Sequence, residues 1–218
     1  MDTIVTVDPT EARRTPLADR PAPRPTGPEP AIRLAEIAHL GKLNLRGETG
    51  EDEAGDRSFM AAVGRVAGLV LPTDPMTVRA VEGVTALWLG PDEWLLTTPP
   101  GAEIDLKARL EEQLAGLHAA VVDVTDNTTI IRLSGPRSRD VLMTACPLDL
   151  HARAFGPGQV KESVFAHVDV ILHLVEEPEG AGERGGAVFD LHVRRSFADY
   201  VWDRLEDAAR PWGGAVAG

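Results

Sequence analysis

Residues 121–150 restrict the possible folds of this chain more than any other stretch of the sequence. A run of mostly apolar residues, Ala120–Val124, is followed by a polar turn at Thr125–Asn127 and by a second run, Thr129–Leu133. Both runs are rich in β-branched residues, which favour extended backbone, and a polar turn between two such runs is typical of consecutive strands. We therefore expect two strands here.

A helix is expected directly after the second of these strands. Gly135 permits backbone angles that other residues avoid, and Pro136 suits the first position of a helix, where its missing N–H leaves no hydrogen bond unmade. The helix is expected to end at Cys146, because Pro147 disfavours helical backbone in the residue before it. Its apolar face consists of Val141, Leu142 and Ala145. The stretch is thus a packing module without an evident catalytic cluster.

Composition excludes several classes of protein. With 218 residues and 43% hydrophobic content, the chain can bury a substantial core, and we expect one compact unit. A formal net charge of -12 argues against binding to nucleic acid, which requires a basic surface. The single cysteine, Cys146, excludes a disulfide framework and a multi-thiolate metal site, and it fits a reducing compartment. We therefore expect a cytoplasmic protein.

The two ends of the chain are expected to differ from its middle. Residues 1–30 contain seven prolines and four arginines but few large apolar side chains, which predicts a disordered tail. The alternative is an extended arm that lies in a groove of a partner. Residues 31–210 are expected to form a single domain, and residues 211–218 a flexible C-terminus. Neither a signal peptide nor an apolar run of roughly 20 residues is recognisable, so no membrane contact is expected.

The expected domain shows a similar order of elements in its two halves. In the first half we expect a helical turn or two over Ile32–Ala38, strands at Leu43–Arg46, Val78–Val81, Thr85–Leu89 and Glu93–Thr97, and helices at about 57–67 and at Ile104–Leu117, the latter with Glu103, Glu111 and Glu112 exposed. In the second half, the module above precedes strands at Gln159–Phe165, Val168–Val175 and Val188–Val193 and a helix at Phe197–Leu205. This order suggests a duplication, with repeats at about 31–117 and 118–210.

No motif in the sequence identifies a catalytic, cofactor or metal site. Gly180–Gly185 matches the GxGxxG pattern of dinucleotide-binding loops, but a strand pattern and not a helix follows it, so a flexible hairpin loop is expected. The six histidines lack metal-ligand spacing, although His167 and His173 are spaced to share a strand face. Cys146 is expected to act as a small buried hydrophobe and not as a reactive thiolate.

Two further features allow a structural and a functional interpretation. Trp88 and Trp94 flank the Gly90–Asp92 turn on one expected sheet face, where they either pack in the core or anchor a partner. Arg195 precedes Ser196, the expected N-cap of the last helix, and contributes to a cationic spot that either meets an acidic partner or stays solvated.

Four motifs occur together in an order that resembles a known family. They are Leu87–Leu96, Leu133–Pro136, Cys146–His151 and Val193–Ala198, and over about residues 31–210 the chain resembles the γ subunits of heterotetrameric sarcosine oxidases. The motif residues are expected to serve folding and assembly and not chemistry. They are Trp88, Gly90, Pro91, Asp92, Trp94, Gly135, Pro136, Cys146, Pro147, Asp149, Arg195 and Ser196.

The resemblance implies both a fold and a role. The family is similar to the folate-binding domain of glycine-cleavage aminomethyltransferases, which implies an α+β fold of duplicated ferredoxin-like units with antiparallel sheets. The complex is implied to oxidise sarcosine to glycine, with formaldehyde or methylene-tetrahydrofolate and hydrogen peroxide as the other products. By the same resemblance, FAD, FMN, NAD and tetrahydrofolate lie on the α and β subunits and zinc on the δ subunit. The γ subunit is implied to assist assembly without a cofactor of its own.

One departure from the aminomethyltransferases bears on folate chemistry. Where those enzymes carry a Gly-Gly-apolar-Asp-Asp stretch, this chain reads Ala166–Val170, with a single carboxylate. His167 and Asp169 are therefore candidates only for a vestigial site. Two alternatives stay open: the equivalent subunit of an N-methylglutamate dehydrogenase-type complex, and a free-standing folate-binding protein of the aminomethyltransferase type.

Overall fold

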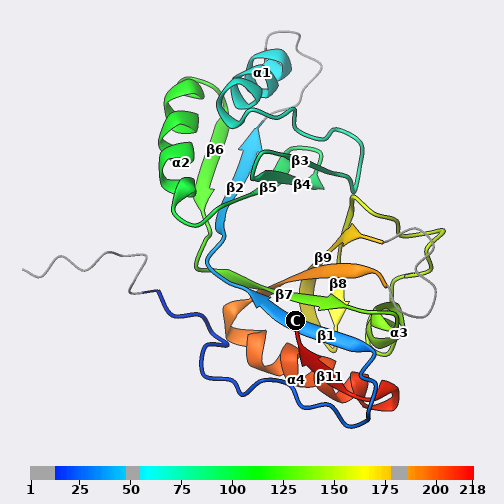
Figure 1. Cartoon of the computed structure of the whole chain (residues 1–218). Helices are drawn as coiled ribbons and strands as arrows, with labels where there is room; N and C mark the ends of the chain where they lie inside the picture. The colour runs from blue at the N-terminus through cyan, green and yellow to red at the C-terminus, as the bar shows by residue number, and fades with distance from the viewer. Residues whose placement is uncertain (1–12, 48–54, 178–185) are drawn as a thin grey trace, which may run out of the picture.

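The chain folds into two antiparallel sheets that face each other, with helices on their outer faces (Figure 1). The computed structural model describes residues 13–47, 55–177 and 186–218. The Gly-rich stretch 180–185 lies outside the described residues. No helix within the described ranges is long and apolar enough to cross a membrane.

The first sheet has five strands and carries helices α1 and α2. Its strands lie in the order β3-β4-β5-β2-β6, and every pair is antiparallel. In chain order the elements are β2 (Gly41–Gly47), α1 (Gly55–Ala67), β3 (Val78–Val81), β4 (Val84–Gly90), β5 (Glu93–Thr98), α2 (Ala102–Gln113) and β6 (Ala119–Asp123). Apart from the edge strand β3, this is the β-α-β-β-α-β order of a ferredoxin-like unit.

The second sheet has six strands in the order β11-β1-β7-β10-β9-β8 and carries helices α3 and α4. Its elements are β1 (Ile32–Ile37), β7 (Thr128–Ser134), α3 (Ser138–Met143), β8 (Gln159–Phe165), β9 (Val168–Glu176), β10 (Val188–Arg194), the short helices η1 (Arg195–Phe197) and η2 (Arg210–Trp212), α4 (Ala198–Ala209) and β11 (Ala215–Ala217). The expected α+β class with duplicated ferredoxin-like units is therefore confirmed.

The boundaries of the expected repeats are wrong, because one strand of the second unit, β1, comes before the first unit in the chain. β1 precedes the first unit in the chain but lies beside β7 in the second sheet, where it fills the position that β6 fills in the first. The predicted helical turn over Ile32–Ala38 is likewise wrong. Ile32 and Leu34 alternate toward the core, and β1 is paired on both sides, with β7 and β11, so its backbone groups are satisfied in a sheet.

Both ends of the described chain pack on the second unit. Residues 13–30 run across α4, where Leu17 is buried and Arg20 pairs with Asp199 at 2.8 Å and also with Asp203. Disorder therefore does not describe this part of the tail, which packs on its own chain. The expectation of a flexible C-terminus is wrong for Ala215–Ala217, since β11 pairs in parallel with β1.

Local helix signals were only partly correct. Glu103, expected on the exposed side of α2, is fully buried, whereas Ile104 is 60% exposed. Pro136 lies in the turn before α3, which begins at Ser138. Ser196 is not an N-cap: it lies within η1, and Phe197 holds the N-cap position of α4 without a side-chain hydrogen bond.

The paired tryptophans pack in the core of the first unit. Trp88 lies directly opposite Trp94 across β4 and β5, so both face α1 and α2. The ring of Trp94 is 5.8 Å from that of Phe59, and its indole N–H donates to the carbonyl of Pro72 at 2.8 Å. The packing interpretation of this pair is thus the one that the structure supports.

Gly135 lies where three backbone segments meet at the end of β7. Its φ is +123°, and a Cβ atom placed there would lie 2.2 Å from the carbonyl oxygen of Ala31. Gly186 approaches from the other side, and its Cβ would lie 1.9 Å from the carbonyl oxygen of Gly135. A side chain at Gly135 would therefore separate β1 from β7.

We expect Gly135→Ala to lower the free energy of unfolding by about 2 kcal/mol, because alanine is strained at this φ and meets backbone that cannot move independently. Urea denaturation measures the change. Gly156→Ala is the matched control, since nothing lies within 4 Å of its Cβ position. Equal losses in the two variants would contradict this account of Gly135.

Candidate functional site

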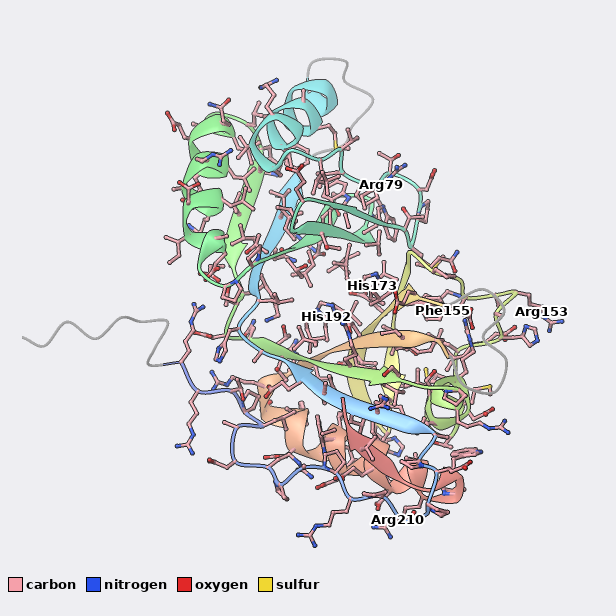
Figure 2. All side chains as sticks on the ribbon, in the orientation of Figure 1. Arg79, Arg153, Phe155, His173, His192 and Arg210 are labelled. Carbon is pink, nitrogen blue, oxygen red and sulfur yellow. The ribbon has the colours of Figure 1, made fainter. Side chains whose placement is uncertain are left out.

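A cleft of about 780 Å³ lies between the two sheets and receives side chains from both. Successive residues of a strand point to opposite faces, so each strand sends one set of side chains to the helices and the other to the cleft. His173 and His192 occupy the space between the sheets in Figure 2. The lining includes Asn44, Leu89, Glu93 and Leu95 from the first sheet, Val122 and Val124 at β6, and Glu162, Val164, Asp169, Ile171, His192 and Arg194 from the second.

Acidic side chains line the cleft from both sheets. Glu93 accepts hydrogen bonds from Arg46 and, at 2.7 Å, from the amide of Asn44, and the hydrogen bond from Arg46 is the main reason that the pKa of Glu93 is lowered. The pKa of Glu162 is raised, first by burial and then by the charges of Glu93 and Asp169. The cleft therefore contains negative charge that its own residues do not fully balance.

A polar cluster on β7, β9 and β10 lies on the cleft-facing side of the second sheet, and its member His192 lines the cleft. Arg132 donates two hydrogen bonds to the carboxylate of Asp190, at 2.7 and 2.8 Å. His192 lies on the same face and is 3% exposed, and burial lowers its pKa to about 3. Burial also lowers the pKa of His173. Both imidazoles are therefore neutral at physiological pH.

The segments that connect the sheets cross at one end of the cleft, near buried Lys42. Its ammonium donates to the carbonyls of Leu40 at 3.1 Å and Thr125 at 3.3 Å, and burial lowers its pKa. Fully buried Glu103 accepts a hydrogen bond from Arg13 at 3.2 Å through Oε1, while its Oε2 has no partner among the described residues. This crossing brings together charged side chains from three separate parts of the chain, two of them buried.

The structure separates the two candidates for a vestigial folate site. Asp169 is exposed on β9 and lines the cleft. His167 lies in the β8–β9 turn with a positive φ of 73°, and it lines a different groove, together with Cys146 and Tyr200. In the described part of the chain the two side chains thus line different hollows, whereas the free-standing folate enzyme would need both in one cleft.

Most of the family-motif residues lie in turns or in the cores and outside the cleft. Pro91 and Asp92 form the β4–β5 turn, and the carbonyl of Asp92 accepts from the N–H of Gly47 at 3.1 Å. Cys146 is buried beside Pro147, but α3 already ends at Met143, so the helix end expected at Cys146 is three residues too late. Asp149 Oδ1 accepts from the N–H of His151 at 3.0 Å. Arg195 donates its N–H to the carbonyl of Asn127 at 3.0 Å. Their expected part in assembly stays a prediction.

Sequence reasoning missed most of the cleft residues, although one signal was present. In β10, polar Asp190, His192 and Arg194 alternate with apolar residues, which predicts a polar face on this strand. Glu162 and Glu93 gave no such signal, because their proximity depends on how the two sheets face each other. Among the described residues, no group of three or more His, Cys, Asp or Glu side chains is placed to hold a metal ion.

The fold defines the class of protein first. The glycine cleavage system aminomethyltransferase T from Bartonella henselae has the same fold, with a TM-score of 0.59 and 16% identity over 83% of this chain and 46% of that chain. The chain is thus an aminomethyltransferase-like α+β protein.

A more specific relationship follows from the sequence. The family model described as "Sarcosine oxidase, gamma subunit family" matches residues 51–211. The sarcosine oxidase subunit gamma of Corynebacterium sp. (strain P-1) is 35% identical over 170 residues, which make up 76% of this chain and 79% of that protein. A chain of the heterotetrameric sarcosine oxidase from Corynebacterium sp. U-96, solved in complex with pyrrole 2-carboxylate, matches with a TM-score of 0.75 and 28% identity over 94% of this chain and 99% of that chain. The chain belongs to the sarcosine oxidase γ-subunit family.

The buried His192 predicts a pH dependence of stability. Its pKa is about 3 in the folded chain and about 6.5 when unfolded, so the unfolded state binds the extra proton as the pH falls. The free energy of unfolding therefore keeps the full contribution of neutral His192 above about pH 6.5. It falls below that pH, by roughly 2 kcal/mol between pH 7 and pH 5. We expect His192→Leu to reduce this loss in urea titrations at the two pH values. His118→Gln, at an exposed histidine, is the control and should behave as the wild type.

Proposed function

We propose that this chain is the γ subunit of a heterotetrameric sarcosine oxidase, and that it supports assembly of the complex without carrying out its chemistry. The observation that carries the proposal is the match to one chain of a solved heterotetramer over nearly the full length of both chains. A match over the whole of both chains favours a subunit of the same kind over a module used in a different context.

The proposed complex follows from the family. It contains α, β and δ subunits beside this one, works in the cytoplasm, and oxidises sarcosine to glycine. The methyl carbon leaves as formaldehyde or on tetrahydrofolate, and dioxygen is reduced to hydrogen peroxide. FAD, FMN, NAD, tetrahydrofolate and zinc belong, in this proposal, to the other subunits.

The geometry of the cleft supports a role outside catalysis. Asp190 is held by two hydrogen bonds from Arg132, and the low pKa of His192 makes it a poor base at neutral pH. Cys146 is buried, and its thiol lies 3.7 Å from the hydroxyl of Ser163. His167 and Asp169 line separate hollows. These features favour the γ-subunit proposal over a free-standing folate enzyme.

Affinity purification of the tagged chain from its native cells tests the proposal. We expect a yellow, flavin-containing assembly of four different chains by intact-complex mass measurement, with sarcosine-dependent formation of hydrogen peroxide. N-Methylglutamate in place of sarcosine distinguishes the related dehydrogenase. Full assembly and activity of the other three subunits without this chain would refute a role in assembly.

A further inference from the structure

Two carboxylates in the cleft between the sheets have no balancing charge beside them. Glu93 is already paired with Arg46, whereas no ion pair or hydrogen bond of Glu162 or Asp169 is found among the described residues. Arg194 is the one cationic side chain in the described lining, and it is exposed. Within the cleft, two unpaired carboxylates therefore face one guanidinium.

A second observation is independent of these acids. His192 lines the same cleft, is 3% exposed, and its Nδ1 has no hydrogen-bond partner among the described residues. Thr128 lines the cleft as well, and its hydroxyl also lacks a partner there. Buried polar atoms in folded proteins are rarely left without a hydrogen-bond partner. Two such atoms on one wall therefore indicate that a ligand supplies the missing hydrogen bonds. A neutral imidazole has one nitrogen that accepts a hydrogen bond from a ligand N–H.

Apolar side chains make up the remainder of the lining. Val122 and Val164 approach from the two sheets and are 51% and 37% exposed, although both line a concave surface. A small core joins the sheets at β4, β5 and β8. Leu95 belongs to this core, and Leu89 and Ile171 pack against it. A volume of about 780 Å³ is within the range of sites for small organic molecules.

We propose that the cleft binds an organic cation, with a substituted ammonium group between Glu162 and Asp169 and an apolar body against Val122 and Val164. A cation in this position offsets the mutual repulsion of the two carboxylates and the partial loss of their hydration. The ammonium N–H groups are donors for the neutral imidazole of His192. The proposal does not depend on the assembly role, because it concerns a hollow built wholly from this chain.

Three probes that share one ring test the charge preference. Benzylamine, benzyl alcohol and benzoate have the same apolar body and carry a positive, neutral or negative group. Isothermal titration of the full chain at low salt should show saturable binding of benzylamine, at least about tenfold tighter than that of benzoate, with benzyl alcohol between them. Added salt should weaken benzylamine binding, because exposed charges are screened. Equal binding of the three probes, or no saturable binding of benzylamine, overturns the proposal.

Variants locate the site. Glu162→Gln and Asp169→Asn keep the size of each side chain and remove its charge, so each should weaken benzylamine binding several-fold. Glu112→Gln is the matched control: it makes the same change at an exposed position on α2, and its affinity should equal that of the wild type. Thermal melts followed by circular dichroism verify that the variants fold. If Glu162→Gln does not fold, Asp169→Asn, at an exposed position, decides the test. Affinities of the cleft variants equal to that of Glu112→Gln would overturn the proposal.

Discussion

The pairing of Lys42 with Thr125 ties together the two segments by which the chain crosses between the sheets, the one leading into β2 and the one leading out of β6. The N–H of Lys42 donates to the hydroxyl of Thr125 at 2.9 Å, and the carbonyl of Lys42 accepts from the N–H of Val124 at the same distance. At the far side, Thr77 bridges to Gln159, so each side of the cleft is closed by backbone contacts. The separation of the two walls, and with it the proximity of the cleft residues, depends on these two junctions.

Elements with local signals could be predicted from the sequence. The hairpin around Gly90–Asp92 and the two strands of the module at residues 121–150 carry their turn residues with them and occur close to the expected positions, whereas the helix of the module is shorter than expected. The family resemblance implied the α+β class, and the order of these elements agrees with it. The Trp88–Trp94 pair was predictable for the same reason, since its register follows from a short turn.

Features that depend on distant partners could not be predicted. The apolar spacing in Ile32–Ala38 fits a helical turn as well as a strand. The segment is a strand because it pairs with β7, which is remote in sequence. Glu103 looked like an exposed acid on an amphipathic helix, but Arg13, from the arm, reaches it in the folded chain. Of the candidate site, only Asp169 was named beforehand, because Glu162 and His192 lie on the neighbouring strands β8 and β10 and join its face only through the register of the second sheet.

The place of β1 in the second sheet also constrains when the protein can fold. On the ribosome the chain emerges from its N-terminus, so β1 leaves the exit tunnel before its partner β7 has been synthesised. The first unit can close once β6 is available, while β1 has to remain unpaired. Its other partner, β11, is synthesised later still than β7. Long-range strand pairing of this kind is slow and leaves an edge open to aggregation, so early protection of β1 is a condition for a good yield of folded chain.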